Sequence, residues 1–460
     1  MTGNLALLSS FRDPAGFVFE RDGILYRQIN QAFQSDLKLL IDSGLQQELH
    51  TEGMVVGFDE ADLSLAATEF AAMVIKPERV PMISYPHEWC FSQLKDAALL
   101  TLEILKRSIA KGMILKDASA YNVQFFGSRP VFIDTLSFEM YKEGAPWIAY
   151  KQFCQHFLAP LAIMSHVNIR LGMLLQTNLD GIPLDLASKL LPLKSNLSPG
   201  LLAHIHLHAK AQQSSSRSPS KSATITKTGL LALVDSLRGT IAGLRWEPTG
   251  TEWSDYYLDT NYSKEAFADK IFTVKSFLGM LPETLTACCD LGANNGEFSR
   301  LATQHGLRTV ALDIDPAAVE KCFLAAKKEG SELLLPLLQD LRNPTPNFGW
   351  GGNERDSIVR RGSADVLLAL ALLHHLVIGN NVPFTMVSEY FASLGEWLIV
   401  EFVPKEDSQI QRMLVARKDI IVDYDQGSFE TAFGAKFEIV TFRKIEGSLR
   451  SIYLMRRKSS

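Results

Sequence analysis

Residues 288–298, CCDLGANNGEF, decide the fold of the second half of this chain. An apolar strand is expected to end at Leu291, and a helix is expected to begin after Gly296. Glycines at such a strand-to-helix turn let a ligand approach the backbone closely. Asp290 adds a carboxylate that can accept hydrogen bonds at the strand end. The stretch therefore indicates a ligand-binding turn at the carboxyl end of a strand.

The sequence around this turn alternates short apolar segments with segments of helical periodicity. Apolar strands separated by helices are typical of a parallel sheet that is covered on both faces. The predicted fold class is therefore α/β, with a doubly wound Rossmann-like sheet. We expect strands at residues 286–291, 308–312, 332–338, 365–370 and 397–402, and helices at residues 296–305, 317–328 and 383–393.

The second predicted strand ends in Asp313, at about the offset from Gly292 where an acidic side chain meets ribose hydroxyls. The dinucleotide fingerprint would also need glycine at positions that Asn294 and Glu297 occupy, and no P-loop motif is present. A ligand with a ribose but no pyrophosphate fits this pattern best. Alternatively, the glycines only shape a turn, and Asp313 and Asp315 cap the next helix.

Five segments in this order resemble the class I S-adenosylmethionine-dependent methyltransferases over about residues 256–452. They are DLGANNG (290–296), LDID (312–315), LLQDLRNP (337–344), ADVLLALALLHHL (364–376) and GEWLIVEFVP (395–404). The resemblance implies S-adenosylmethionine as cofactor, with Asp313 on its ribose and Asp340 facing its adenine. The cofactor-binding residues that it implies are Asp290, Gly292, Asn294, Gly296, Asp313, Asp340 and Leu341.

The acceptor side of such a site needs a positioned nucleophile, and a general base only if the acceptor is protonated. His374 and His375 follow the fourth strand and Glu401 ends the fifth, so these three are the candidate catalytic residues. Each could equally orient a loop or pack beneath the cofactor. Four aromatic residues upstream could close over the cofactor or acceptor or simply pack: Trp253, Tyr256, Tyr257 and Tyr262. Residues 348–362 form an insertion whose arginines, Arg355, Arg360 and Arg361, could contact an anionic acceptor or line a solvated loop. These three are called the insertion arginines below.

The N-terminal part contains LKDASAYNVQFFGSRPVFIDTLSFE, residues 115–139. Asp117 and Asn122 have the spacing of a kinase catalytic loop, and Asp134 follows where a metal-binding aspartate would stand. Residues 17–208 therefore resemble a two-lobed α+β protein kinase, which implies Mg-ATP as a ligand. No glycine-rich loop is visible, and Arg27 stands where the lysine is expected. A pseudokinase platform is one alternative, and polar residues that only satisfy backbone groups are another.

A serine-rich stretch at residues 209–228 is predicted to be a linker. It would separate a kinase-like domain, residues 1–208, from a methyltransferase domain, residues 229–460. The 460 residues carry 46 Lys and Arg against 51 Asp and Glu, a net charge of −5. Such a balance disfavours a generally basic nucleic-acid surface without excluding a local patch.

The five cysteines have no disulfide or zinc spacing, so we expect a reducing compartment and no metal site. We expect no secretory signal, because the N-terminus lacks a basic region and a long apolar run. No apolar run approaches the length of a membrane span. A cytoplasmic protein without a membrane partner is predicted.

The fusion of the two predicted domains resembles bacterial methyltransferases related to host-specific nodulation proteins. This resemblance implies methyl transfer to a small molecule or a glycan. The sequence does not name the acceptor, the atom that is methylated or the oligomeric state. Two alternatives remain open: an ATP-dependent phosphotransferase that uses the N-terminal domain, and a non-catalytic nucleotide-binding regulator.

Overall fold

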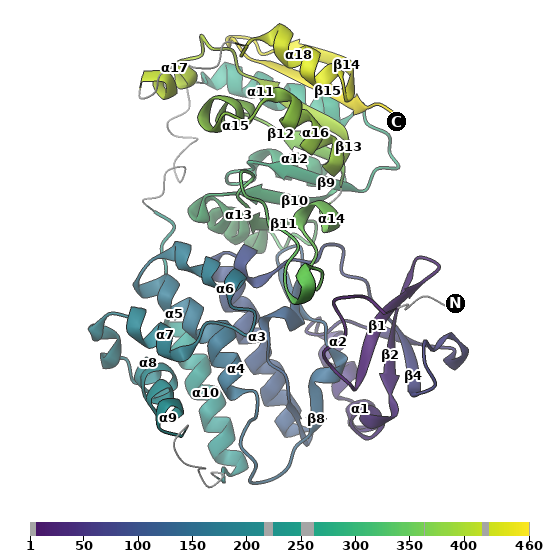
Figure 1. Ribbon diagram of the computed structural model, residues 1–460, viewed down its shortest axis with the longest axis vertical. Helices are drawn as coiled ribbons and strands as arrows, with labels where there is room; N and C mark the ends of the chain where they lie inside the picture. Colours follow the sequence, from purple (N-terminus) through teal and green to yellow (C-terminus); the bar gives the residue numbers. More distant parts are fainter. Residues whose placement is uncertain (1–5, 216–223, 250–261, 363, 416–422, 460) are drawn as a thin grey trace. The chain divides into compact units, whose positions relative to one another are not determined.

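The computed structural model describes residues 6–215, 224–249, 262–362, 364–415 and 423–459 (Figure 1). The chain forms two compact units. Unit 1 comprises residues 1–247 together with 347–355, and unit 2 comprises residues 248–346 and 356–460. Each unit is therefore built from two segments that are not adjacent in the sequence.

Unit 1 begins with a four-stranded antiparallel sheet in the order β1-β2-β4-β3. Its first two strands form a hairpin, in which Asp22 and Gly23 both have positive φ, 51° and 75°, as a tight turn between twisted strands requires. The segment before β3 lies outside this sheet, because the backbone of Met54 and Val56 bonds to Phe132. The strands are β1 (Gly16–Arg21), β2 (Ile24–Asn30), β3 (Phe58–Ala61) and β4 (Ala71–Pro77).

Helices and two small strand pairs form the remainder of unit 1. The pairs are β5 (Met113–Leu115) with β8 (Phe138–Met140) and β6 (Val123–Phe126) with β7 (Arg129–Phe132). The helices are α1 (Gln34–Asp42), α2 (Leu45–Thr51), α3 (Phe91–Ala110), α4 (Tyr150–Phe153), α5 (Ala159–His166), α6 (Leu174–Thr177), α7 (Leu184–Leu190), α8 (Pro199–Leu201), α9 (His208–Ser215) and α10 (Lys227–Gly243).

The structure corrects the predicted domain boundary at residues 209–228. Residues 208–215 form helix α9, residues 216–223 lie outside the described part, and α10 then packs along α3 within unit 1 (Figure 1). Lys95 of α3 donates to the carbonyls of Ala242 and Leu244 at 3.0 and 2.8 Å, which caps the end of α10. The division into units therefore falls after Glu247.

Unit 2 contains a seven-stranded sheet in the order β11-β10-β9-β12-β13-β15-β14. The first five strands are parallel, and β15 and β14 complete the sheet as an antiparallel hairpin. The doubly wound expectation is confirmed, with that hairpin as an unpredicted addition. The strands are β9 (Ala287–Leu291), β10 (Arg308–Asp313), β11 (Leu334–Leu338), β12 (Ala364–Ala369), β13 (Gly395–Phe402), β14 (Phe437–Lys444) and β15 (Ser451–Arg457).

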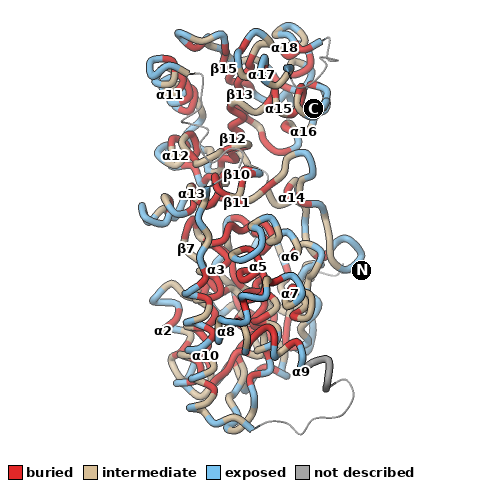
Figure 2. Tube along the Cα trace, turned by 90° about the vertical axis from the view of Figure 1, so that its left-hand side faces the viewer, coloured by how far each residue is buried: buried red, intermediate tan, exposed pale blue. Residues whose placement is uncertain are grey.

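Helices cover both faces of this sheet, and its central strands are buried (Figure 2). One face packs on α11, α12 and α13 through alternate strand residues such as Cys288 and Ala311. The other packs on α16 and α18, where Phe402 stacks on Phe429. The helices are α11 (Lys264–Leu278), α12 (Glu297–Gln304), α13 (Pro316–Lys328), α14 (Ile358–Arg361), α15 (Leu373–Asn380), α16 (Phe384–Leu394), α17 (Ser408–Val415) and α18 (Gln426–Gly434). Among the described residues, we found no helix with the length and apolar character of a membrane span.

Candidate cofactor site

The glycine turn between β9 and α12 adopts a backbone shape that demands small residues. Gly292, Asn294 and Gly296 have φ values of 75°, 49° and 81°. The N–H groups of Gly292 and Ala293 both donate to the carbonyl of Leu312 at 2.9 Å, so the turn is tied to the end of β10. After β9 the chain adds β10 and β11 on one side of that strand, and then crosses to add β12 on its other side. The turn therefore lies at the topological switch point, where ligands bind in open α/β sheets.

Asp313, the last residue of β10, is linked to this turn by hydrogen bonds to its carboxylate. One carboxylate oxygen accepts the N–H of Asn294 and the other accepts the N–H of Asp315, both at 2.8 Å. Burial raises the pKa of Asp313 to about 6, although these hydrogen bonds oppose the shift. The backbone of Ile314 is a third donor to this carboxylate. A carboxylate has about four acceptor positions, so one remains for a ribose hydroxyl. Asp315 caps α13 by accepting from Ala317 and Ala318, which matches its expected capping role.

Asp290 supports the turn from within the unit. Its side chain is almost fully buried and accepts a hydrogen bond from the Ser299 hydroxyl of α12 at 2.6 Å. Burial raises the pKa of Asp290 to about 7, and the nearby charge of Asp313 adds to the shift. These contacts brace the first helical turn of α12 against the end of β9.

Asp340 and Leu341 follow β11, the next strand beyond β10. The N–H of Gln339 donates to the carbonyl of Asp313 at 2.8 Å, which brings the two strand ends together. Asp340 accepts from the backbone and guanidinium of Arg342, at 2.9 Å each. Burial alone would raise the pKa of Asp340, but these contacts with Arg342 lower it. Leu341 is half-buried.

His374 and His375 lie in the first turn of α15, directly after the β12 turn. Their ring centroids are 4.2 Å apart. Burial lowers the pKa of both histidines, and that of His375 falls to about 4. Nδ1 of His374 has no hydrogen-bond partner within the described residues. Both imidazoles are therefore uncharged near pH 7, and the burial that keeps them uncharged also makes them weak bases.

Glu401, near the end of β13, is held in a buried ionic network. Its carboxylate contacts the Tyr262 hydroxyl, accepts from Lys270 Nζ at 2.7 Å and from the Ala371 N–H at 2.8 Å. Arg450 approaches it at 3.5 Å. Burial works to raise the pKa of Glu401, but Lys270 and Arg450 hold it at about 2. With both oxygens engaged by donors, Glu401 is poorly placed to accept a proton from a substrate.

Sequence reasoning did not single out Lys270 and Arg450. Lys270 is 3% exposed and stands on the apolar side of α11, between Ala266 and Val274. A lysine among apolar residues at helical spacing is a usable signal of a buried ion pair. Arg450 lies between β14 and β15, and nothing in its local sequence distinguishes it from an exposed loop arginine.

The insertion arginines make contacts within the protein. Arg355 lies in unit 1, with its guanidinium 4.6 Å from the ring centroid of Tyr121. Arg360 pairs with Asp356 at 3.4 Å, and Arg361 donates to the Asp356 carbonyl. Each of these three arginines therefore already has a contact within the protein.

In unit 1 the predicted kinase-like residues lie in one polar cluster. Asp134 contacts the Arg27 guanidinium with one oxygen and accepts from the Ser137 hydroxyl with the other. Asn122 donates to the same hydroxyl at 3.1 Å. Burial, and secondarily the charge of Asp134, raise the pKa of Asp117. The pKa of Asp134 is lowered, because Arg27 and Ser137 outweigh the effect of burial.

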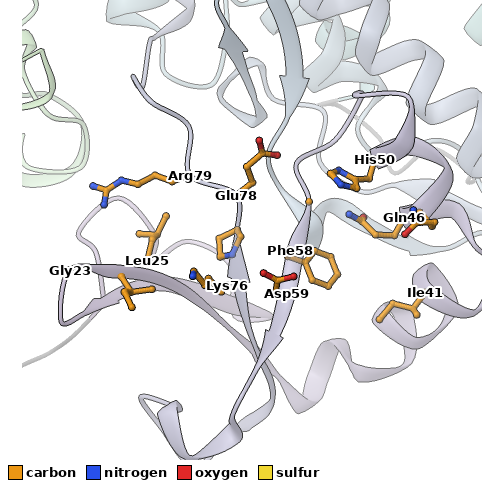
Figure 3. A pocket seen from close by; sticks show the side chains of 14 residues that line it. Gly23, Leu25, Ile41, Gln46, His50, Phe58, Asp59, Lys76, Glu78 and Arg79 are labelled. Atoms are coloured by element: carbon orange, nitrogen blue, oxygen red, sulfur yellow. The ribbon is translucent and has the colours of Figure 1, made fainter. Parts of the chain in front are cut away.

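A separate hollow of about 940 Å³ opens on unit 1 between the ends of β2, β3 and β4 and the helices α1 and α2 (Figure 3). Its walls carry charges of both signs, including Asp59, Lys76 and Arg79. None of the predicted site residues lines it. In the part of the chain that the structure describes, no group of three His, Cys, Asp or Glu side chains could hold a metal ion.

Comparison with known proteins places the chain in a family. No protein-family model matches it. Nodulation protein NoeA of Rhizobium meliloti (strain 1021) is 36% identical over 460 residues, which cover 97% of this chain and 95% of that protein. The chain belongs to the NoeA family. The matched residues span both units of this chain.

Solved structures match about half of this NoeA family member. Magnesium protoporphyrin IX methyltransferase (ChlM) from Synechocystis PCC 6803, with bound SAH, is 20% identical and covers 45% of this chain and 93% of its own, with a TM-score of 0.32. WbdD, crystallised with a kinase inhibitor, is 17% identical and covers 45% and 43%, with a TM-score of 0.32. N-methyltransferase NodS from Bradyrhizobium japonicum WM9 is 10% identical and covers 43% and 99%, with a TM-score of 0.31. By its own strand order, unit 2 has a Rossmann-like methyltransferase fold.

Proposed function

We propose that unit 2 transfers a methyl group from S-adenosylmethionine. The observation that carries this proposal is the Asp313 carboxylate, which is joined to the glycine turn and keeps an acceptor position at the switch point of the sheet. The residues fit the cofactor: positive φ at Gly292 and Gly296 lets its tail approach the backbone, and Asp340 lies on the neighbouring strand end. When bound, S-adenosylmethionine supplies a methyl group on a positively charged sulfur.

The protein's own residues would bind and orient the reactants. Asp313 would hold the ribose, and the turn would exclude a larger diphosphate because Asn294 projects where a glycine would be needed. The imidazoles of His374 and His375 carry no charge near pH 7, but their lowered pKa makes them weak bases, and the engaged carboxylate of Glu401 is poorly placed to accept a proton. Positioning provides most of the rate enhancement in such a displacement.

The proposed acceptor is a small molecule or a glycan. Two observations support this choice over nucleic acid: the net charge of −5, and the pairing of the insertion arginines within the protein. A broad phosphate-binding surface would instead need unpaired basic side chains.

Calorimetric titration with S-adenosylhomocysteine tests the proposed cofactor. The wild type is expected to bind, and Asp313→Ala is expected to weaken binding by about tenfold or more, since a hydrogen bond to a charged group is lost. Asp235→Ala, in an exposed ion pair of unit 1, is the matched control and should bind as the wild type does. Absence of binding to the wild type, or unchanged binding by Asp313→Ala, would contradict the proposal.

A second function is proposed for unit 1, whose cluster of Asp117, Asn122 and Asp134 favours a kinase-like nucleotide site. Both oxygens of Asp134 are already engaged by Arg27 and Ser137. In this arrangement the residues do not fit a magnesium ion, so nucleotide binding without catalysis is favoured over phosphoryl transfer. ATP titration with and without Mg²⁺ separates these roles. Mg²⁺-dependent binding that Asp134→Ala abolishes would support a phosphotransferase, and absence of any binding would contradict both roles.

A further inference from the structure

The turn after β12 contains an unusual backbone conformation. Ala371 has a φ of 51°, in the left-handed region that side-chain-bearing residues rarely adopt. Such residues persist only where surrounding contacts hold them, and they concentrate at functional sites. The contact in this case is the hydrogen bond from the Ala371 N–H to Glu401 Oε2, at 2.8 Å.

This turn also forms a wall of the candidate cofactor site. A Cβ placed on Gly292 would lie 3.3 Å from Cδ1 of Leu372, so Leu372 packs directly on the glycine turn. The carbonyl of Leu372 accepts the N–H of His375 at 2.9 Å and begins α15. The conformation at Ala371 therefore determines where Leu372 and the two histidines stand.

The Glu401 carboxylate is itself rigidly placed. Lys270 of α11 donates to the same oxygen that accepts from Ala371, and the Tyr262 hydroxyl contacts the other oxygen. Arg450 approaches Glu401 and also binds Asp407 with two nitrogens, at 2.7 and 3.1 Å. Two positive and two negative side chains thus balance in a buried network. Removing one partner from such a network is strongly destabilising, because it leaves an uncompensated buried charge.

We propose that Glu401 is a positioning residue: together with Lys270 it clamps Ala371 in its left-handed conformation and so seats Leu372 against the cofactor turn. The clamp itself is a property of the fold. Its consequence for cofactor affinity rests on the proposed function of unit 2. On this account Glu401 acts through the backbone and takes no proton from the acceptor.

Hydrogen exchange in the ligand-free protein tests the clamp directly. In the double variant Lys270→Met, Glu401→Met, which removes both charges together, the peptide containing Ala371 and Leu372 should exchange at least about tenfold faster than in the wild type. The matched control is Asp269→Asn with Arg443→Met, which removes an ion pair from the same helix α11 without touching Ala371. This control should exchange at the wild-type rate in that peptide. Equal rates in the two double variants would overturn the clamp.

Rescue by glycine separates positioning from general destabilisation. The double variant is expected to bind S-adenosylhomocysteine about tenfold more weakly than the wild type. Adding Ala371→Gly should restore most of this affinity, because glycine adopts positive φ without a side-chain penalty. Failure of the rescue would overturn the positioning role. If the wild type binds no S-adenosylhomocysteine, the proposed function fails, while the exchange measurement still decides whether the clamp exists.

Discussion

At the scale of single residues, two glycines with the same φ of 81° make a matched pair. A Cβ on Gly296 would lie 2.4 Å from Sγ of Cys322, whereas a Cβ on Gly306 would meet nothing within 4 Å. Gly306→Ala should therefore cost only the backbone penalty, about 1 kcal/mol in the free energy of unfolding. Gly296→Ala should cost about 1–3 kcal/mol more, because the added methyl overpacks the site.

Urea denaturation measures both free energies. Cys322→Ala removes the clashing sulfur, so in that background the difference between Gly296→Ala and Gly306→Ala should shrink. Equal costs for the two glycine substitutions in the wild-type background would contradict the packing seen at the glycine turn.

The buried carboxyls Asp290 and Asp313 make stability depend on pH. Their folded-state pKa values, about 7 and about 6, are raised chiefly by burial, so the folded chain keeps protons that the unfolded chain releases above about pH 4. The free energy of unfolding should therefore fall as pH rises from about 4 to 7, by at most about 1.4 kcal/mol per pH unit for each carboxyl.

Urea denaturation between pH 4 and 8 tests whether Asp290 causes this pH dependence, with one variant at Asp290 and one at its hydrogen-bond partner Ser299. Asp290→Asn cannot titrate and keeps an acceptor for Ser299, so its decline in stability should be shallower. Ser299→Ala removes the hydrogen bond that lowers the pKa of Asp290, so its decline should extend to higher pH. Identical pH slopes in the wild type and both variants would show that Asp290 does not carry the effect.

At the scale of elements, the segment 347–355 is held within unit 1 by a specific ion pair. The guanidinium of Arg12 binds the buried carboxylate of Glu354 at 2.6 and 2.8 Å, and the N–H of Trp350 donates to the same carboxylate at 2.9 Å. Phe348 meets the ring of Tyr85 edge-on, with centroids 5.1 Å apart. The segment therefore has a defined structure although its sequence, rich in glycine, suggests a loop.

Removal of this ion pair should loosen the segment. Arg12→Met leaves Glu354 buried and partly unsatisfied, so we expect a loss of about 1–3 kcal/mol and faster hydrogen exchange in residues 347–355. Arg360→Met is the control: it removes an exposed pair with Asp356, which is worth at most about 1 kcal/mol. Unchanged exchange in Arg12→Met would mean that the aromatic contacts alone hold the segment.

At the scale of the whole molecule, α10 determines where unit 1 ends. Its buried side chains include Leu230, Val234, Leu237 and Ile241, and it lies along α3. A fragment ending at residue 228 would therefore expose an apolar face of α3, whereas one ending at residue 247 would keep it covered. We expect the shorter fragment to aggregate or melt at lower temperature than the longer one, as measured by size-exclusion chromatography and circular dichroism. Equal behaviour would contradict the placement of α10 in unit 1.

Local patterns were sufficient for most of unit 2. Alternation of apolar strands and amphipathic helices predicted its parallel core. The offset between Gly292 and Asp313 placed these two residues on adjacent strand ends, and the family resemblance added Asp340. Parallel strands bring their carboxyl ends to one edge, so this grouping follows from order along the chain alone. Unit 1 was harder to predict from local sequence. The segment at Met54 has strand-like residues, yet its backbone pairs with the distant Phe132.

The sequence by itself therefore determined the fold class of unit 2, the candidate cofactor residues and the polar cluster of Asp117, Asn122 and Asp134. Only the tertiary structure decided that Glu401 is engaged by Lys270 and Ala371, that residues 347–355 belong to unit 1, and that α10 completes that unit. The physical reason is the distance along the sequence between the interacting residues. Periodicity and turn chemistry are set by neighbours in sequence, whereas the protonation of a carboxylate and the partner of a helix depend on groups more than a hundred residues away.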